Sequence, residues 1–271
     1  MMNSISERRS VVTGRAIREH VLRESRRANV GHIGSALSIA DILAALYGRI
    51  LRVEDFDDPE RDRFVLSKGH AALALYAALA LAGCLDDADL RTYCGEDSLL
   101  GVHPESALRG IDFCTGSLGQ GLGMSAGSAL AAMKQSKQRR VFAIVSDAEL
   151  NEGSTWEAVM FAAQQRLSNL YVFVDANGQQ ALGYTRDVIA IENAVERFAD
   201  FGWDATLVDG HDVSAIEAAV EAAANDPRPH VFVAKTIFGR GVSFMQSQIK
   251  WHYWPMSADE FEQAMAEVAR T

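Results

Sequence analysis

From about residue 139 onward, short apolar runs alternate with segments of helical spacing. The runs are rich in β-branched residues and read RVFAIVS (140–146), LYVFVD (170–175), WDATLVD (203–209) and HVFVAKTI (230–237). Helix-like segments lie between them or before them, at 117–136, 152–167, 188–200 and 213–225. Strands that alternate with helices in this way form a mostly parallel sheet with helices on both faces. The sequence therefore predicts an α/β fold.

The N-terminal third of the chain is predicted to be helical around a single strand. Apolar residues at helical spacing predict helices at 6–29, 38–50 and 71–83, and an apolar run predicts a strand at 63–67. Ser38 is predicted to cap the second of these helices, Asp41 to be its first-turn acid, and Gly83 to end the third. A last helix is predicted at 257–269, and no linker or repeat divides the chain. We therefore expect one domain over residues 1–271.

Composition and charge exclude several classes of protein. The 271 residues include 26 basic and 36 acidic ones, which gives a net charge of −10 and argues against a general nucleic-acid-binding protein. The three cysteines cannot all pair and none lies in a CxxC motif, so a reduced, cytoplasmic compartment is expected. No stretch reaches the roughly 18 apolar residues of a membrane span, and the first residues lack an apolar core. Neither membrane nor nucleic-acid partners are expected.

Acidic and amide residues follow two of the predicted strands. Asp147 comes directly after the first of the runs above, Asp175 ends the second, and Asn177 follows two residues later. Ligands of such sheets collect at the carboxyl ends of the strands, and neighbouring strands lie about 5 Å apart. Asp147 and Asn177 can therefore share one Mg²⁺, which prefers few carboxylates and completes its shell with phosphate and water. The alternative is that Asp147 and Asp175 only cap helices and turns.

A glycine-rich segment precedes an alanine-rich helix. It reads TGSLGQGLG over 115–123. Glycine lets the backbone approach a ligand closely, and a helix N-terminus favours phosphate. The segment is neither a Walker motif nor a dinucleotide fingerprint, because it lacks GK[ST] and a clear preceding strand. Tight packing between helices is the alternative explanation.

Four of the seven histidines lie in turn-like settings beside glycine, proline or aromatic residues. They are His32, His70, His103 and His252. Their spacing matches no zinc motif. Imidazoles that titrate near neutrality suit proton transfer and contacts to a developing oxyanion. Each of them taken singly is more often a surface or hydrogen-bonded histidine.

Taken together, these motifs resemble the diphosphate-binding half of the transketolase family. The resemblance covers nearly the whole chain, and the order and joint spacing of the motifs carry it. The motifs are ANVGHIG (28–34), DRFVLSKGHA (62–71), GVHPE (101–105), TGSLGQG (115–121), EGSTWEA (152–158), NL (169–170) and DANGQQ (175–180).

The resemblance implies a thiamine diphosphate cofactor and Mg²⁺ (or Ca²⁺). It assigns the metal to Asp147, the Asn177 side chain and the main-chain oxygen of Gln179. Contacts to the cofactor, chiefly at its diphosphate, are implied for His70, Gly116, Leu118, Asp147, Ala148, Asn177 and His252.

The resemblance also implies residues for the reaction. Glu152 matches a glutamate that links cofactor sites across the subunit interface, and it is counted among both the catalytic and the cofactor-binding residues. His32, His103 and His252 match residues that face substrate or move protons. The reaction implied is transfer of a two-carbon ketol unit from a ketose phosphate to an aldose, with the cofactor as electron sink.

The sequence departs from the family pattern at the metal site. The usual Gly-Asp-Gly is replaced by Ser146-Asp147-Ala148. If the third position requires a positive φ, alanine is strained there by about 1 kcal/mol.

A second departure is that only one predicted helix follows the Trp251–His252 segment. Family transketolases continue into a second α/β domain, with the glutamate that activates the cofactor, and then a C-terminal domain. The resemblance therefore implies the N-terminal subunit of a split transketolase. We expect it to act with a separate C-terminal subunit that carries the pyrimidine-binding domain, in a heterotetramer on small sugar phosphates.

Two alternatives remain open. One is a related thiamine enzyme subunit with a different donor or acceptor, such as a dihydroxyacetone-type reaction, a specialised sugar or a 2-oxo acid. A deoxyxylulose-phosphate synthase is disfavoured by the stretch EGSTWEA at 152–158. The other is a non-catalytic regulatory or scaffold partner.

Overall fold

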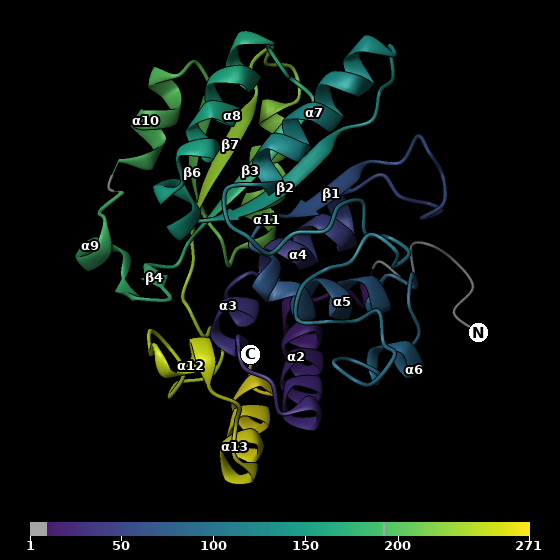
Figure 1. Cartoon of the computed structure of the whole chain (residues 1–271), viewed down its shortest axis with the longest axis vertical. Helices are drawn as coiled ribbons and strands as arrows, with labels where there is room; N and C mark the ends of the chain where they lie inside the picture. The colour runs from purple at the N-terminus through teal and green to yellow at the C-terminus, as the bar shows by residue number, and fades with distance from the viewer. Residues whose placement is uncertain (1–9, 192) are drawn as a thin grey trace.

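A parallel five-stranded sheet forms the centre of the molecule (Figure 1). The structure, a computed structural model, describes residues 10–191 and 193–271. The strands lie in the order β1-β2-β3-β7-β6, and every pair is parallel. Their bounds are Arg63–Leu66 for β1, Val141–Ser146 for β2, Leu170–Ala176 for β3, Asp204–Asp209 for β6 and His230–Lys235 for β7. The predicted α/β fold with a mostly parallel sheet is confirmed.

Successive residues of the central strands belong to two different hydrophobic cores. In β2, Phe142 and Ile144 belong to one core, whereas Val141, Ala143 and Val145 belong to the other. Side chains of a strand point alternately to opposite faces, so each core covers one face of the sheet. Burial on both faces explains why these strands read as continuous apolar runs.

Helices cover both faces, as predicted. One core takes in α7 (Gly121–Lys134), α8 (Gly153–Gln164) and α10 (Ala194–Asp200). The other takes in the N-terminal helices, α11 and the C-terminal helices. Figure 1 shows α12 and α13 beside α2 and α3, below the sheet. The bounds of this second group are Gly14–Ala28 for α2, Ile33–Ser38 for α3, Ala40–Ala45 for α4, Ala72–Leu81 for α5, Asp87–Leu90 for α6, Val213–Ala223 for α11, Lys250–Tyr253 for α12 and Ala258–Val268 for α13.

Short elements gather at the carboxyl ends of the strands. The 3-10 turns η2 (Gly69–Ala71) and η3 (Ala148–Asn151) follow β1 and β2. The antiparallel ladder of β4 (Gln179–Gln180) and β5 (Gly183–Tyr184) follows β3 and leads into α9 (Thr185–Val188). Within the ranges described, no helix is both long and apolar enough to cross a bilayer.

Three predicted helices differ from the structure. The helix predicted at 6–29 begins, in the described residues, at Gly14 with Thr13 as its N-cap, and its positions 6–9 lie outside the described residues. The helix predicted at 38–50 is α4 followed by a π-helical turn, η1 (Leu46–Ile50), and Ser38 ends α3 instead of capping α4.

The third difference is at 188–200, where α9 and α10 are separate helices. Asn193, with a φ of 63°, precedes α10. The other predicted elements agree with the structure, and Gly83 follows α5 with a φ of 80°.

Candidate functional site

A cavity of about 500 Å³ opens at the carboxyl end of the sheet, where the chemistry was predicted. All the predicted site residues except Asp147 line it. They are His32, His70, His103, Gly116, Leu118, Ala148, Glu152, Asn177, Gln179 and His252. Residues separated by more than two hundred positions in the chain thus meet at one place.

Three of the four predicted histidines form a cluster. The ring centroids of His32 and His70 are 5.5 Å apart, those of His32 and His252 are 5.2 Å apart, and those of His70 and His252 are 5.4 Å apart. The His32 amide donates to the carbonyl of His252, and the His70 ring bonds Ser35 Oγ through Nε2 at 2.9 Å. His103 is exposed on the cavity rim, with its ring against Gly116.

The surroundings of these histidines favour neutral rings. Burial lowers the pKa of His252 to about 4, aided by the charges of His32 and Lys68. Burial likewise lowers the pKa of His70 well below its ordinary value, with help from Lys68, and lowers that of His32. The Nδ1 atoms of His32 and His252 are buried and make no hydrogen bond with the described residues. Neutral imidazoles with free nitrogens can accept a proton or hydrogen-bond a ligand.

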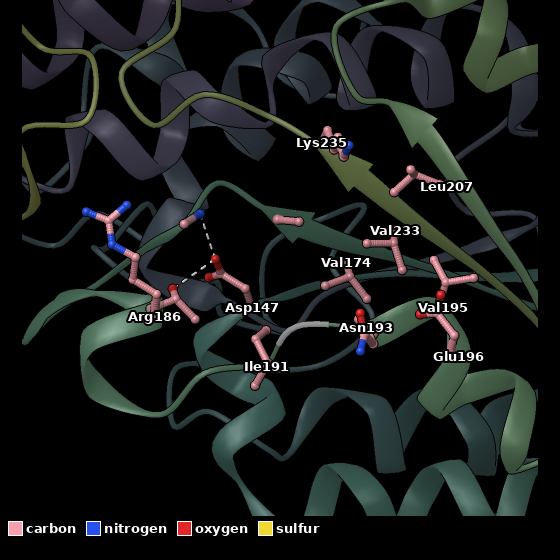
Figure 2. A pocket seen from close by; sticks show the side chains of 14 residues that line it. Asp147, Val174, Arg186, Ile191, Asn193, Val195, Glu196, Leu207, Val233 and Lys235 are labelled. Atoms are coloured by element: carbon pink, nitrogen blue, oxygen red, sulfur yellow. Dashed lines mark hydrogen bonds between the residues drawn. The ribbon is translucent and has the colours of Figure 1, made fainter.

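Asp147 lies behind the cavity wall at the end of β2. Its Oδ2 accepts hydrogen bonds from the Gly178 amide at 2.7 Å and from Thr185 Oγ1 at 3.1 Å (Figure 2). Its Oδ1 accepts one from the Ala148 amide at 2.8 Å. Burial and the nearby charge of Asp175 raise the pKa of Asp147 to about 7. These three hydrogen-bond donors are all neutral, so a cation bound here would relieve a buried negative charge.

Figure 2 shows that Asp147 also borders a second cavity, of about 480 Å³. Apolar side chains such as Val174, Val233 and Leu207 wall this cavity, and Lys235 lies at its edge.

The loop after β3 carries amide side chains and contacts Asp147 through the Gly178 amide. The Asn177 side chain donates to Asp175 Oδ2 at 2.7 Å, so its oxygen, which accepts the Gln179 amide at 2.9 Å, faces the other way. Gln179 Oε1 is buried and has no hydrogen-bond partner among residues 10–191 and 193–271. No three His, Cys, Asp or Glu side chains converge on a metal position in the parts of the chain that the structure describes. One carboxylate with neutral oxygens nearby fits Mg²⁺, which takes most of its ligands from water and phosphate.

Asp175 and Lys68 form a buried ion pair that was not predicted from the sequence. Lys68 Nζ lies 2.5 Å from Asp175 Oδ2, and both side chains are fully buried. Ser38 Oγ and Thr236 Oγ1 also donate to this carboxylate. Burial alone would raise the pKa of Asp175, but Lys68 and these donors hold it below its ordinary value. The pair therefore has a structural role and orients Asn177.

A buried glutamate organises the glycine-rich segment. Glu149 accepts the Gly119 amide at 2.8 Å and Ser67 Oγ, and burial raises its pKa. Gly119 has a φ of 85°, and a Cβ on Gly121 would lie 2.7 Å from the Cα of Ser67. Close packing therefore accounts for part of the segment, whereas ligand binding by it stays a prediction. Gly121 allows close packing, while Gly116 and Leu118 line the cavity.

Ala148 and Glu152 flank the end of β2. Ala148 begins η3 and does not have a positive φ, so the strain considered for a Gly-to-Ala change is absent. Glu152 is exposed at the cavity and precedes α8 as its N-cap residue.

Two residues that line the cavity, Lys68 and Phe238, were not predicted from the sequence, and only Lys68 has a sequence signal that could have indicated it. Lys68 directly follows a strand, which is an unusual place for a lysine that becomes buried. Phe238, which also lines the cavity, carried no such signal.

Comparisons with known proteins agree with this geometry. Residues 7–269 match the family model described as transketolase, thiamine diphosphate binding domain. A 6-deoxy-6-sulfo-D-fructose transketolase subunit of Clostridium sp. (strain MSTE9) is 38% identical over 258 residues, which is 94% of each chain. One of the apulose-4-phosphate transketolase subunits of Actinobacillus succinogenes is 37% identical over 88% of this chain and 87% of its own.

Longer transketolases match over part of their length. Human transketolase is 37% identical over 94% of this chain, which spans 41% of the human protein. The crystal structure of Campylobacter jejuni transketolase superposes with a TM-score of 0.88 at 29% identity, over 98% of this chain and 42% of that one. The chain therefore belongs to the transketolase family, as a transferase that carries the family's thiamine-diphosphate-binding domain.

Proposed function

We propose that this chain is the N-terminal subunit of a heteromeric transketolase that moves a two-carbon ketol unit from a ketose phosphate to an aldose. The observation that carries the proposal is the cavity itself. It joins a cluster of three neutral histidines to the Asp147–Asn177 strand ends and the glycine-rich segment. We further propose that residues 1–271 form a single domain and that the protein is cytoplasmic. The three unpaired cysteines support this location.

The metal and the cofactor fit the residues present. Asp147, the Asn177 side-chain oxygen and the Gln179 main-chain oxygen would hold Mg²⁺ or Ca²⁺. Gly116, Leu118, Ala148 and His70 would hold the cofactor diphosphate, with His252 and Glu152 completing its surroundings. Bound thiamine diphosphate supplies a nucleophilic carbon and an electron sink for the cleaved donor.

The histidines would handle protons at the substrate. His32 and His252 each keep a buried Nδ1 that has no hydrogen-bond partner in the described parts of the chain, and His103 reaches the cavity from its exposed rim. A neutral ring can take a proton from a donor hydroxyl as its C–C bond breaks, and can return it to the acceptor oxygen.

The anionic end of the substrate would be bound by the partner subunit. Lys68 is the only lysine or arginine among the described residues that line the cavity, and it is buried and paired with Asp175. The partner would also supply the pyrimidine-binding domain and its activating glutamate, in a heterotetramer. The two relatives of similar length that are named as subunits support this division.

The cavity and the relatives restrict the identity of the sugar substrate less than they restrict the type of reaction. One relative is named for a sulfonated fructose and another for apulose 4-phosphate, so subunits of this size occur with different anionic ketoses in their names. A donor of another class, such as a 2-oxo acid or a specialised sugar, is therefore the second candidate. A panel of donors that contains both anionic ketoses and 2-oxo acids, with glyceraldehyde 3-phosphate and erythrose 4-phosphate as acceptors, distinguishes these candidates.

The test is an Asp147→Ala variant in the complex with its partner subunit. We expect two-carbon transfer to fall by about a hundredfold or more, because the metal that holds the diphosphate is lost. Asp200→Ala, at an exposed carboxylate that ends α10, is the matched control and should keep full activity. Unchanged activity of Asp147→Ala would instead favour the scaffold alternative.

A further inference from the structure

Three polar residues from distant parts of the chain form a buried group beside the cavity wall. Arg18 of α2 donates through both terminal nitrogens to Asp41 of α4, and His211, in the loop after β6, bonds Asp41 Oδ2 through Nδ1 at 2.8 Å. The three side chains are only 5%, 13% and 8% exposed, in the order Arg18, Asp41 and His211. None of them lines the cavity, and the proposed reaction does not use them.

The backbone determines which nitrogen of His211 carries the proton. The amide of Ile237 donates to His211 Nε2 at 2.9 Å. An amide cannot accept a hydrogen bond at its nitrogen, so Nε2 is the acceptor and Nδ1 is protonated and donates to Asp41. Asp41 in turn is held by Arg18, and the side-chain hydrogen bonds of His211 and Arg18 offset burial and lower the pKa of Asp41. Arg18 and Asp41 thus orient His211 so that its Nε2 accepts a hydrogen bond from the main chain at Ile237.

That acceptor holds a segment that leads from the end of β7 to the cavity. Thr236 donates to Asp175, and the ring of Phe238 lies nearly parallel to that of His252, at 11° with centroids 6.2 Å apart. A Cβ on Gly34 would lie 2.1 Å from the Phe238 ring, so the ring has little room to move toward α3. The Ile237 amide lies between these two contacts.

We propose that His211, oriented by Asp41 and Arg18, is a positioning residue for the active site. Its Nε2 sets the course of residues 236–238 after β7, and thereby places Phe238 against His252 and Thr236 on Asp175. The expected effect of this proposal on the reaction rate rests on the proposed ketol transfer. The expected effect on the position of Phe238 does not.

A close approach of α2 supports the importance of this group. A Cβ on Gly14 would lie 1.8 Å from Asp41 Oδ1. The first residue of α2 therefore has to be glycine for Asp41 to reach both Arg18 and His211.

The experiment compares His211→Phe with His211→Gln. Phenylalanine keeps the ring but loses both hydrogen bonds, while glutamine offers one N–H donor and one carbonyl acceptor on a single planar group. His230→Gln is the control, since His230 is a fully buried histidine of β7 with a carboxylate and a carbonyl partner, outside the cavity.

The first readout is NMR of the full chain, which needs no reaction. We expect His211→Phe to shift the Ile237 amide and the carbon-bound ring proton of His252, because the Phe238 ring moves relative to His252. His211→Gln should restore the His252 signal toward its wild-type position, and His230→Gln should leave it unchanged. An unmoved His252 signal in His211→Phe, or an equal shift in His230→Gln, would overturn the proposal.

The second readout is ketol transfer by the complex with the partner subunit. We expect His211→Phe to lower kcat by about tenfold or more with little change in the KM of the aldose acceptor, and glutamine to recover most of it. Equal losses in all three variants would show a merely structural role and contradict the proposal. If the wild-type complex transfers no ketol unit, the proposed function fails and the NMR result alone decides the role of His211.

Discussion

Two aspartates at neighbouring strand ends have opposite electrostatic environments. Asp175 is neutralised by Lys68, whereas the donors that the described residues offer Asp147 are all neutral and its pKa is raised to about 7. Both follow apolar strands in the sequence, and nothing local separates them. The difference comes from Lys68, which reaches across from the end of β1, and it leaves Asp147 as the carboxylate available to a metal.

The Lys68–Asp175 pair gives a stability prediction. Lys68→Met should lower the free energy of unfolding by about 3 kcal/mol or more, because it leaves Asp175 buried without its countercharge. Adding Asp175→Asn should recover part of this loss, because the double variant buries no charge at this place. Urea unfolding followed by circular dichroism measures both. A double variant no more stable than Lys68→Met would contradict the account.

The low pKa of His252 predicts a pH dependence of stability in the chain without cofactor. Between pH 6.5 and about 4 the unfolded chain binds a proton at His252 that the folded chain does not, so stability is complete above pH 6.5 and falls as the pH decreases. The loss from this residue between pH 7.5 and 5 should be on the order of 2 kcal/mol.

Unfolding of His252→Asn should therefore depend less on pH than that of the wild type over this range. His20→Asn, at a histidine of α2 outside the cavity, serves as the control. Equal slopes for wild type and His252→Asn would show that His252 is not held neutral.

At the scale of elements, the N-terminus of α7 is positioned by close packing. Gly121, its first residue, lies against Ser67 at the end of β1, which brings the glycine-rich segment beside η2. Gly127, in the same helix, has open space where a methyl group would stand, since outside its own helical turn no atom of the described residues lies within 4 Å of that position. Two glycines of one helix therefore serve different purposes.

These glycines form a matched pair of variants. Gly121→Ala should destabilise the chain by about 1–3 kcal/mol, because its Cβ meets the backbone of Ser67. Gly127→Ala should stabilise it by about 0.5–1 kcal/mol, since alanine favours a helix interior. Thermal unfolding of the isolated chain checks both signs, and a neutral Gly121→Ala would show that the loop tolerates displacement.

The break between α3 and α4 illustrates where local patterns fail. Ser38 is a good N-cap residue by type, but its hydroxyl donates to Asp175 instead. A tertiary hydrogen bond to a residue 137 positions away thus replaces the local cap, and no local sequence window contains both partners.

At the scale of the molecule, the sheet and the collection of site residues could be predicted from the sequence. Continuous apolar strands specify a sheet buried on both faces, and parallel order brings their carboxyl ends together. The contacts that hold the site in place could not be predicted. The Lys68–Asp175 pair, the His211–Ile237 bond and the Phe238–His252 stacking each join residues that only the finished fold brings close.

The central claim is that the active site is completed only when this chain combines with a partner subunit. This chain provides a cavity with histidines and a nearby carboxylate that we propose binds the metal, but no unpaired lysine or arginine among the described residues that line it. The most direct measurement is ketol transfer with Mg²⁺ and thiamine diphosphate, by the purified chain alone and after addition of its partner subunit. The account predicts no transfer by the chain alone and transfer once the partner is added. Robust transfer by this chain alone would contradict it.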